Sequence, residues 1–477
     1  MTEYTVTFLP QGITVPVKAG CNVLQAQILA GLRPDAPCGG KGTCGKCRVM
    51  LEGREVLACQ TPVDRNMTVR TADQEQHKIL TGGIQNQLQP DGTDDYAMAF
   101  DVGTTTLVAY LLDGHTGALL ARSSCINPQS RYGADVISRI QHVLDGGGDA
   151  MAACVRGAME ELTAEAARKA GIPPERITAS SVVGNTAMHH LLLGIDPGPL
   201  VTPPYMPAVF KAIEKNGARI LPNIAGFVGG DTVGCMAAVR FDRLEELSLL
   251  IDIGTNGEMV LGDKNRRIAC STAAGPAFEG ARISCGMRGA EGAVDHVAVQ
   301  DGEIVYHTIA DAPPRGLCGS GLLDLVAVLL DREIIDESGR LEGGAYRLCD
   351  NVTLTQKDVR EVQLAKAAIR AGIELLAETM GVQTADIRRV YLAGAFGNYM
   401  DPASACRIGM IPPVLLDRIV PIGNAAGEGA KLCALSRAEF EYSRRLAAGT
   451  EFLELASLPG FQDCYVDSLE FCEEEEA

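Results

Sequence analysis

Residues 96–106 read YAMAFDVGTTT, and residues 248–258 read SLLIDIGTNGE. In each stretch an apolar strand reaches an aspartate, and a turn rich in glycine and polar residues leads into a second apolar strand. The aspartate of the second copy, Asp252, follows that of the first, Asp101, by 151 residues. The repetition predicts an internal duplication, in which two similar α/β halves carry equivalent turns.

A second pair of segments supports the duplication. SSVVGNTAMHH, from Ser180, and VYLAGAFGNYM, from Val390, each run from a β-branched strand into a glycine turn. The chemistry of the D-x-G-T turn is specific, because it presents backbone N–H groups and hydroxyls to phosphate oxygens, with a carboxylate placed to hold Mg²⁺ through water. Two such turns facing each other across a cleft would hold a nucleoside triphosphate; a pair of ordinary hairpins is the alternative.

This repeated pattern resembles the ASKHA superfamily of acetate and sugar kinases, Hsp70 and actin, which is built from ribonuclease-H-like halves. The resemblance implies a first phosphate motif over residues 101–106, a second over residues 252–258 and an adenosine motif over residues 392–398. The nucleotide-binding residues expected in these motifs are Gly103, Thr104, Thr105, Thr106, Gly254, Thr255, Asn256, Gly257, Gly394, Ala395, Phe396 and Gly397.

A further glycine-rich segment, GLCGSGLLD at residues 316–324, opens an apolar helix. Because helix N-termini attract anions, Gly319, Ser320 and Gly321 are candidates for contact with the nucleotide. A glycine-rich helix start without any ligand is equally compatible with this pattern.

Four carboxylates are candidates for catalysis: Asp101, Asp231, Asp252 and Glu258. They could hold Mg²⁺ or orient water, although Asp231 heads a helix-like stretch that also suits a helix N-cap. The segment AAGPAFEG, residues 273–280, resembles another cleft loop and has Glu279 as its one charge. The sequence assigns no chemistry to the segment NPQSRYGADVISRI at residues 127–140.

The N-terminal region contains four cysteines in the spacing C-x5-C-x2-C-x11-C: Cys38, Cys44, Cys47 and Cys59. A [2Fe–2S] cluster needs four thiolates, and the surrounding glycines let one loop fold around it. Zinc is the alternative, but zinc sites usually pair two C-x2-C knuckles and only one is present here. A hairpin, a helix beginning after Asn22 and later short strands accompany this loop, and the whole resembles the β-grasp [2Fe–2S] ferredoxins, with the x5 spacing of adrenodoxin-like members.

Composition limits the possible partners and location. The net charge is −18, which argues against nucleic acid and favours solubility or the steering of a redox partner. No apolar run reaches the length of a membrane span, and the N-terminus does not resemble a signal peptide, so we expect no membrane association and a cytoplasmic protein.

These features predict an α/β multidomain chain. We expect a β-grasp ferredoxin-like domain of α+β type (1–71), a polar linker (72–95), two ASKHA halves (96–247 and 248–460) and a C-terminal tail (461–477). The last five residues of the tail, EEEEA, are expected to be solvated and disordered. The linker is either a tether on which the cluster could swing or a connection packed on the surface.

The combination resembles the reductive activators of corrinoid proteins. That resemblance implies an ATP-dependent reductase with slow ATPase activity, which reduces Co(II) to Co(I) in a corrinoid protein of anaerobic methyl transfer, such as acetogenesis or O-demethylation. It implies a [2Fe–2S] cluster, ATP and Mg²⁺, a low-potential donor such as ferredoxin or flavodoxin, and a homodimer. Some members carry an extra middle domain, which the short linker predicts to be absent here.

Three alternatives remain at this stage. An activator of a 2-hydroxyacyl-CoA dehydratase or benzoyl-CoA reductase also couples ATP to electron transfer, but those proteins hold a [4Fe–4S] cluster between subunits and have no ferredoxin domain. A nucleotide-binding redox sensor would need no electron acceptor. A sugar kinase would have no use for the cluster.

Overall fold

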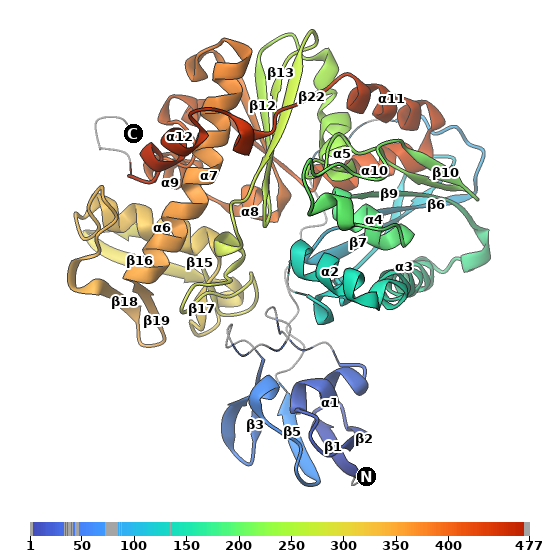
Figure 1. The fold of residues 1–477 in the computed structure, drawn as a ribbon, viewed down its shortest axis with the longest axis vertical. Helices are drawn as coiled ribbons and strands as arrows, with labels where there is room; N and C mark the ends of the chain where they lie inside the picture. Colours follow the sequence, from blue (N-terminus) through green and yellow to red (C-terminus); the bar gives the residue numbers. More distant parts are fainter. Residues whose placement is uncertain are drawn as a thin grey trace.

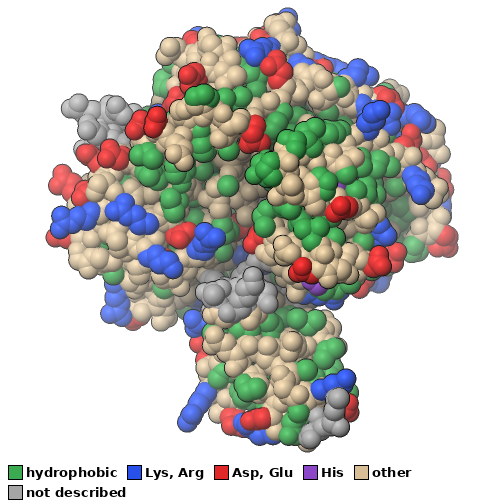
Figure 2. Space-filling model, viewed as in Figure 1, with side chains coloured by type: hydrophobic (Ala, Val, Ile, Leu, Met, Phe, Trp, Pro, Cys, Tyr) green, Lys and Arg blue, Asp and Glu red, His purple; other side chains and the backbone are tan. Residues whose placement is uncertain are grey.

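The computed structural model describes residues 3–32, 34, 36, 40, 42, 47–71, 84, 86, 88–133 and 135–471. A small N-terminal domain lies at one end of the molecule, and two larger α/β halves stand side by side at the other (Figure 1). In the space-filling view the N-terminal domain projects from the larger body, and acidic and basic side chains are interspersed on the face drawn (Figure 2). Among the described residues, no helix is long and apolar enough to cross a membrane.

The N-terminal domain has the mixed sheet expected of a β-grasp fold. Its strand order is β2-β1-β5-β3-β4, in which β1 and β5 run parallel and the other pairs are antiparallel. Asn22 begins the helix with a capping box, in which its side chain accepts from Gln25 N. The elements are β1 (Glu3–Leu9), β2 (Ile13–Lys18), α1 (Val23–Leu29), β3 (Arg48–Leu51), β4 (Arg54–Leu57) and β5 (Met67–Thr71).

The first half of the large body is a six-stranded sheet of order β10-β11-β9-β6-β7-β8. Strands β6 to β8 form an antiparallel meander, and β9 adds parallel to β6. Its elements are β6 (Tyr96–Val102), β7 (Thr106–Asp113), β8 (Leu119–Ile126), α2 (Val136–His142), α3 (Gly148–Ala170), β9 (Ile177–Gly184), α4 (Thr186–Leu193), β10 (Ile213–Lys215), β11 (Ala218–Ile220) and α5 (Gly230–Val239).

The second half repeats this order as β21-β20-β12-β13-β14-β22. Here β12 to β14 form the meander and β20 adds parallel to β12, so the two pairs of segments matched in the sequence occupy equivalent places. The elements of the sheet are β12 (Ser248–Ile253), β13 (Gly257–Gly262), β14 (Arg267–Thr272), β20 (Arg389–Ala393), β21 (Ile419–Gly423) and β22 (Glu451–Phe452). The predicted duplication is confirmed.

Two smaller sheets and most of the remaining helices also belong to the second half. The sheets consist of β15 (Ala293–Gln300), β16 (Glu303–Thr308) and β17 (Gly316–Leu317), and of β18 (Ala345–Cys349) and β19 (Val352–Thr355). The helices are α6 (Gly319–Asp331), α7 (Gln356–Met380), α8 (Gly394–Tyr399), α9 (Pro402–Arg407), α10 (Ala425–Leu435), α11 (Arg437–Ala448) and α12 (Phe461–Asp467).

Helices α5 and α10 join the two halves. One continuous core contains their buried faces together with residues of both large sheets, such as Ala99 of β6 and Leu250 of β12. The helices approach closely because a Cβ on Gly429 would lie 2.3 Å from the carbonyl oxygen of Gly234. Both helices begin near the predicted turns, so their packing places one half against the other at the site.

The described residues of the linker and of the C-terminal tail both pack on the large body, which for the linker favours the surface-packed connection over the free tether. The backbone of Asn86 donates to Glu428 Oε1 (2.8 Å), and Ile84 N donates to Ile422 O (3.0 Å), so the described part of the linker is packed on the large body. Helix α12 lies against α7, and Phe471 is buried in the core of the second half, so residues 461–471 are not a free tail. Residues 72–83 of the predicted tether and the acidic residues 472–477 lie outside the described residues.

Candidate functional site

The two predicted phosphate turns are closed in a similar way, although the second is one residue shorter. The first joins β6 to β7, and Gly103 N donates to Thr106 O (2.9 Å); the second joins β12 to β13, and Gly254 N donates to Asn256 O (2.9 Å). Each turn is closed by its own backbone, which leaves the intervening threonine hydroxyls available to other partners. That arrangement is compatible with binding phosphate oxygens.

A single carboxylate connects the turns. Thr255 Oγ1 donates to Glu279 Oε1 (2.9 Å), and Thr105 Oγ1 donates to Glu279 Oε2 (3.3 Å). Glu279 ends a short 3₁₀ turn, residues Ala277–Glu279, in the second half. The two turns therefore face each other within the reach of one side chain, as binding a triphosphate from both sides requires.

The four candidate carboxylates also gather at this site, and each is half-buried. The pKa of Asp101 is raised to about 6, chiefly by burial, and that of Asp252 is raised to about 6 by the same cause. Burial and the negative charge of Asp252 raise the pKa of Asp231 to about 7. Burial and the charges of Asp231 and Asp252 hold the pKa of Glu258 well above its usual range. Burial, with the neighbouring negative charges as a smaller cause at Asp101, Asp231 and Glu258, disfavours the ionised carboxylates, and a bound cation would offset both effects.

Asp231 does not cap its helix. The N-cap of α5 is Gly229, and Asp231 Oδ1 accepts from the next residue, Thr232 N (2.8 Å). The sequence interpretation of Asp231 as an N-cap is therefore wrong, and its carboxylate is placed among the acidic groups instead.

No three His, Cys, Asp or Glu side chains of the described ranges converge tightly enough to hold a metal ion by themselves. Mg²⁺ normally keeps several waters and binds proteins through one or two carboxylates together with substrate phosphates. The arrangement of Asp101 and Asp252 therefore fits a magnesium ion that arrives with the nucleotide and is held through water.

The segment predicted to bind adenosine lies beside the second turn. Gly394 has a φ of +85°, and a Cβ on it would lie 2.6 Å from Oδ1 of Asp252, so glycine is required for this close approach. Phe396 stacks on Phe278 with ring centroids 4.6 Å apart. A Cβ on Gly397 would lie 3.3 Å from Cβ of Leu392 in β20. Gly394 is thus the residue of this segment that lies directly against the second phosphate turn.

The Gly-Ser-Gly segment has structural contacts of its own. Ser320 Oγ donates to Asp295 O (2.8 Å), and a Cβ on Gly321 would lie 2.1 Å from Val294 O. A Cβ on Gly319 would lie 2.9 Å from the ring of Phe396, so of the three residues Gly319 is next to the predicted adenosine motif. Close packing thus accounts for much of this glycine pattern.

Three further residues hold the site, and the sequence did not single them out. Asn424 donates to Asp101 Oδ2 (2.8 Å), Asn185 donates to Thr104 Oγ1 (2.9 Å), and the Cys235 thiol donates to Asp252 Oδ2 (3.7 Å). Both asparagines follow the last residue of a parallel strand, β21 or β9, which is the signal that could have identified them.

The cysteine loop is described only in part, because Cys38 and Cys44 lie outside the described residues. Cys47 and Cys59 are both buried in the domain core, and Ala58 N donates to Cys47 O (2.7 Å), which brings their backbones together. A Cβ on Gly40 would lie 3.7 Å from Cβ of Cys59, so Gly40 lies beside that residue. These positions fit the convergence of thiolates that a [2Fe–2S] cluster needs.

The fold and the site define a protein in which a β-grasp [2Fe–2S] ferredoxin domain is joined to a duplicated ASKHA domain. Three family models match the chain. The 2Fe-2S iron-sulfur cluster binding domain matches residues 6–66, the RACo middle region matches residues 96–244, and the C-terminal ASKHA domain of RACo matches residues 246–477.

The relatives agree with these matches. The chain is 31% identical to the corrinoid activation enzyme RamQ of Eubacterium limosum, over 91% of this chain and 94% of the relative. It is 30% identical to a [Co(II) methylated amine-specific corrinoid protein] reductase of Methanosarcina barkeri, over 55% of this chain and 54% of the relative. A solved structure of a reductive activator for corrinoid,iron-sulfur protein superposes with a TM-score of 0.71 at 28% identity, covering 98% of each chain. The chain belongs to the family of corrinoid activation enzymes.

One expectation is corrected by these matches. The RACo middle region corresponds to residues 96–244, which form the first half of the large body. The expectation that this chain lacks a middle region was therefore wrong. The region is present as the sheet that carries the first phosphate turn.

Proposed function

We propose that this protein is an ATP-dependent reductive activator, which passes one electron at a time to the Co(II) form of a corrinoid protein and regenerates Co(I) for methyl transfer. One observation carries the proposal: a single chain joins a ferredoxin domain with inward-facing cysteines to a cleft where two phosphate turns meet. The membership of the chain among the corrinoid activation enzymes supports it.

The ferredoxin domain has the role of electron carrier. Cys47 and Cys59, together with Cys38 and Cys44 of the same motif, would hold the cluster. When bound, the cluster supplies one-electron chemistry. We propose a low-potential donor such as ferredoxin or flavodoxin upstream.

The ASKHA cleft has the role of nucleotide switch. The hydroxyls and backbone amides of the turns at residues 103–106 and 254–257 would bind phosphates, and Asp101 and Asp252 would hold Mg²⁺ through water. Asp231 and Glu258 would orient a water for slow hydrolysis. Because the two turns belong to different halves, binding a triphosphate between them would close one half on the other and change the surface offered to a partner.

Three further parts of the proposal follow from the family resemblance. We propose that the protein works in the cytoplasm, in anaerobic methyl-transfer metabolism such as acetogenesis or O-demethylation, and as a homodimer formed through its ASKHA module. The presence of a ferredoxin domain disfavours a 2-hydroxyacyl-CoA dehydratase activator, and the paired phosphate turns would be unnecessary in a simple redox carrier.

Visible spectroscopy of a corrinoid protein provides the test. The reduced protein should convert Co(II) to Co(I) only when Mg-ATP is present. The variant Asp252→Ala should keep the visible spectrum of its own cluster but should no longer reduce Co(II) when Mg-ATP is added. If the wild-type protein leaves the corrinoid as Co(II) in the presence of Mg-ATP, the proposed function is wrong. If Asp252→Ala hydrolyses ATP as the wild type does, the assignment of the cleft is wrong.

A further inference from the structure

The contact between Glu279 and the two phosphate turns uses groups that a nucleotide would need. A threonine hydroxyl has one hydrogen to donate. In the structure Thr105 and Thr255 both donate theirs to the Glu279 carboxylate, at 3.3 and 2.9 Å. A phosphate oxygen can accept from these hydroxyls only if the carboxylate gives them up. Glu279 thus occupies the bonding position of a phosphate group between the turns.

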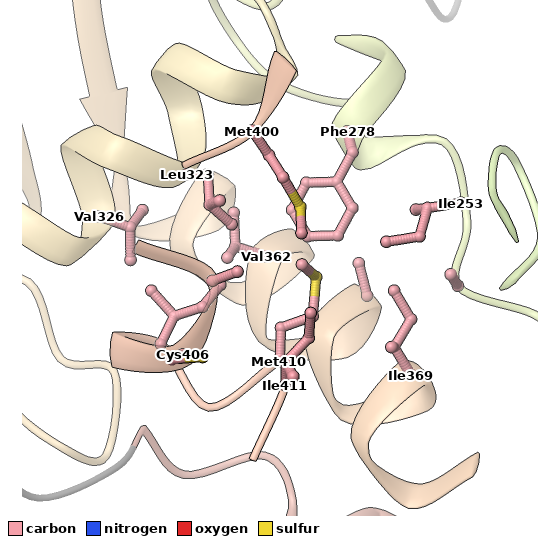
Figure 3. Packing of buried hydrophobic residues seen from close by; sticks show 14 of the residues in the cluster. Ile253, Phe278, Leu323, Val326, Val362, Ile369, Met400, Cys406, Met410 and Ile411 are labelled. Carbon is pink, nitrogen blue, oxygen red and sulfur yellow. The ribbon is translucent and has the colours of Figure 1, made fainter. Parts of the chain in front are cut away.

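The position of Glu279 is fixed by its neighbours. Phe278 is 3% exposed and belongs to the core of the second half, where its ring lies next to Met400 and near Ile253 (Figure 3). On the other side, Gly280 has a φ of +74°, and a Cβ on it would lie 2.3 Å from Met287 O. The backbone on both sides is therefore held, and the side chain is the part that can move.

A buried cation close to the turns adds to the case for an anion. Arg139 of α2 is fully buried and donates to neutral acceptors, Gly133 O (3.0 Å) and Met188 Sδ (3.5 Å). Within the described residues, no carboxylate lies at ion-pair distance from it. Burial lowers the pKa of Arg139 to about 10, and the charge of Glu279 is one of those that oppose this shift. A buried cation without a paired anion is costly, and phosphate would supply negative charge here.

We propose that Glu279 is an internal phosphate mimic, which holds Thr105 and Thr255 together between the two turns and must be displaced by the phosphates of Mg-ATP. The inference rests on the proposed nucleotide function and adds what sets the affinity of that site. The carboxylate connects the two turns, and it weakens nucleotide binding by the net free energy of the two hydrogen bonds that must be broken. Glu279 is a positioning residue in this role.

Mg-ATP binding to the full-length protein with its cluster tests the proposal. Glu279→Ala removes both hydrogen bonds, and we expect the Kd for Mg-ATP to fall roughly tenfold. Glu279→Asp keeps the charge but is one methylene too short to reach both threonines, and we expect it to bind more tightly than the wild type as well. Glu279→Gln keeps the length and can still bridge the hydroxyls, so its Kd should stay closer to the wild-type value.

A matched control is Glu291→Ala, which removes an exposed carboxylate from the same segment of the chain and should leave the Kd unchanged. Cluster absorbance and the unfolding temperature show whether each variant is folded; if Glu279→Ala is not, the more conservative Glu279→Asp carries the test. If Glu279→Ala and Glu279→Gln bind Mg-ATP more tightly than the wild type and Glu279→Asp does not, charge repulsion alone explains the effect and the proposal is wrong. The proposal is also wrong if both Glu279→Ala and Glu279→Asp bind Mg-ATP no more tightly than the wild type. An absence of Mg-ATP binding by the wild type would instead overturn the proposed function.

Discussion

The side-chain amide of Asn424 donates a hydrogen bond of 2.8 Å to Oδ2 of Asp101, although 323 residues separate the two in the sequence. Asn424 also caps α10, because its Oδ1 accepts from Gly427 N (2.6 Å). One side chain thus joins the first phosphate turn to the start of a helix that packs between the two sheets. A change in the position of Asp101 on nucleotide binding would therefore be transmitted through Asn424 to the N-terminus of α10.

Replacing Asn424 with alanine should affect both stability and the nucleotide site. The loss of the cap costs about 0.5–2 kcal/mol of unfolding free energy. Asp101 would also lose the hydrogen bond that favours its charged form, so we expect Mg-ATP to bind several-fold more weakly. Denaturant unfolding and Mg-ATP titration measure the two effects. Asp401→Ala is the control, because Asp401 caps α9 by accepting from Ala403 N (2.8 Å) and should lose stability alone. Wild-type affinity in Asn424→Ala would contradict the coupling.

Cys59 and Cys21 allow a matched test of the predicted cluster ligands. Both pack in the N-terminal domain, but only Cys59 belongs to the four-cysteine motif. Cys59→Ser should bleach the visible absorbance and lower the iron content, because a hydroxyl is a poor replacement for a thiolate. Cys21→Ser should keep both. Iron analysis and absorbance spectra of the purified proteins check this, and an intact spectrum in Cys59→Ser would remove that residue from the ligand set.

The features that the sequence predicted are those encoded locally. The D-x-G-T turns, the hairpin of β1 and β2 and the helix that begins after Asn22 depend on residues a few positions apart, and the structure has each of them. Glu279 and Asn424 reach the first turn from 174 and 323 residues away. Their local sequence marks a cleft loop and a strand end, but it does not show which distant side chains they contact. The burial of Phe471 was missed for the same reason, since its partners lie in α7 and at Glu337.

The described part of the linker should contribute to stability. Asn86 donates from its backbone to Glu428 Oε1 and from its side chain to Ala238 O (3.0 Å), so it connects α10 and α5. Asn86→Ala removes the side-chain bond and leaves the carbonyl of a buried helix end without this donor, which should lower the unfolding free energy by about 1–2 kcal/mol. Thr93→Ala in the same segment removes an exposed hydrogen bond to Asp94 and should change stability by less than about 0.5 kcal/mol. Equal unfolding curves for the two variants would show that the linker is not anchored at Asn86.

His189 should make the large body sensitive to acid. Its Nδ1 lies 2.8 Å from Nδ2 of Asn223, and burial lowers its pKa to about 4 from an ordinary value of 6.5. Between these values the unfolded chain binds a proton at His189 and the folded chain does not, so the free energy of unfolding falls as the pH falls from about 7 to about 4. The loss amounts to about 3 kcal/mol for this residue. His189→Gln should flatten this part of the pH profile in urea unfolding, whereas His115→Gln, in which the replaced side chain is 59% exposed, should keep the wild-type slope. A profile for His189→Gln that runs parallel to the wild type would show that His189 is able to take up its proton in the folded protein.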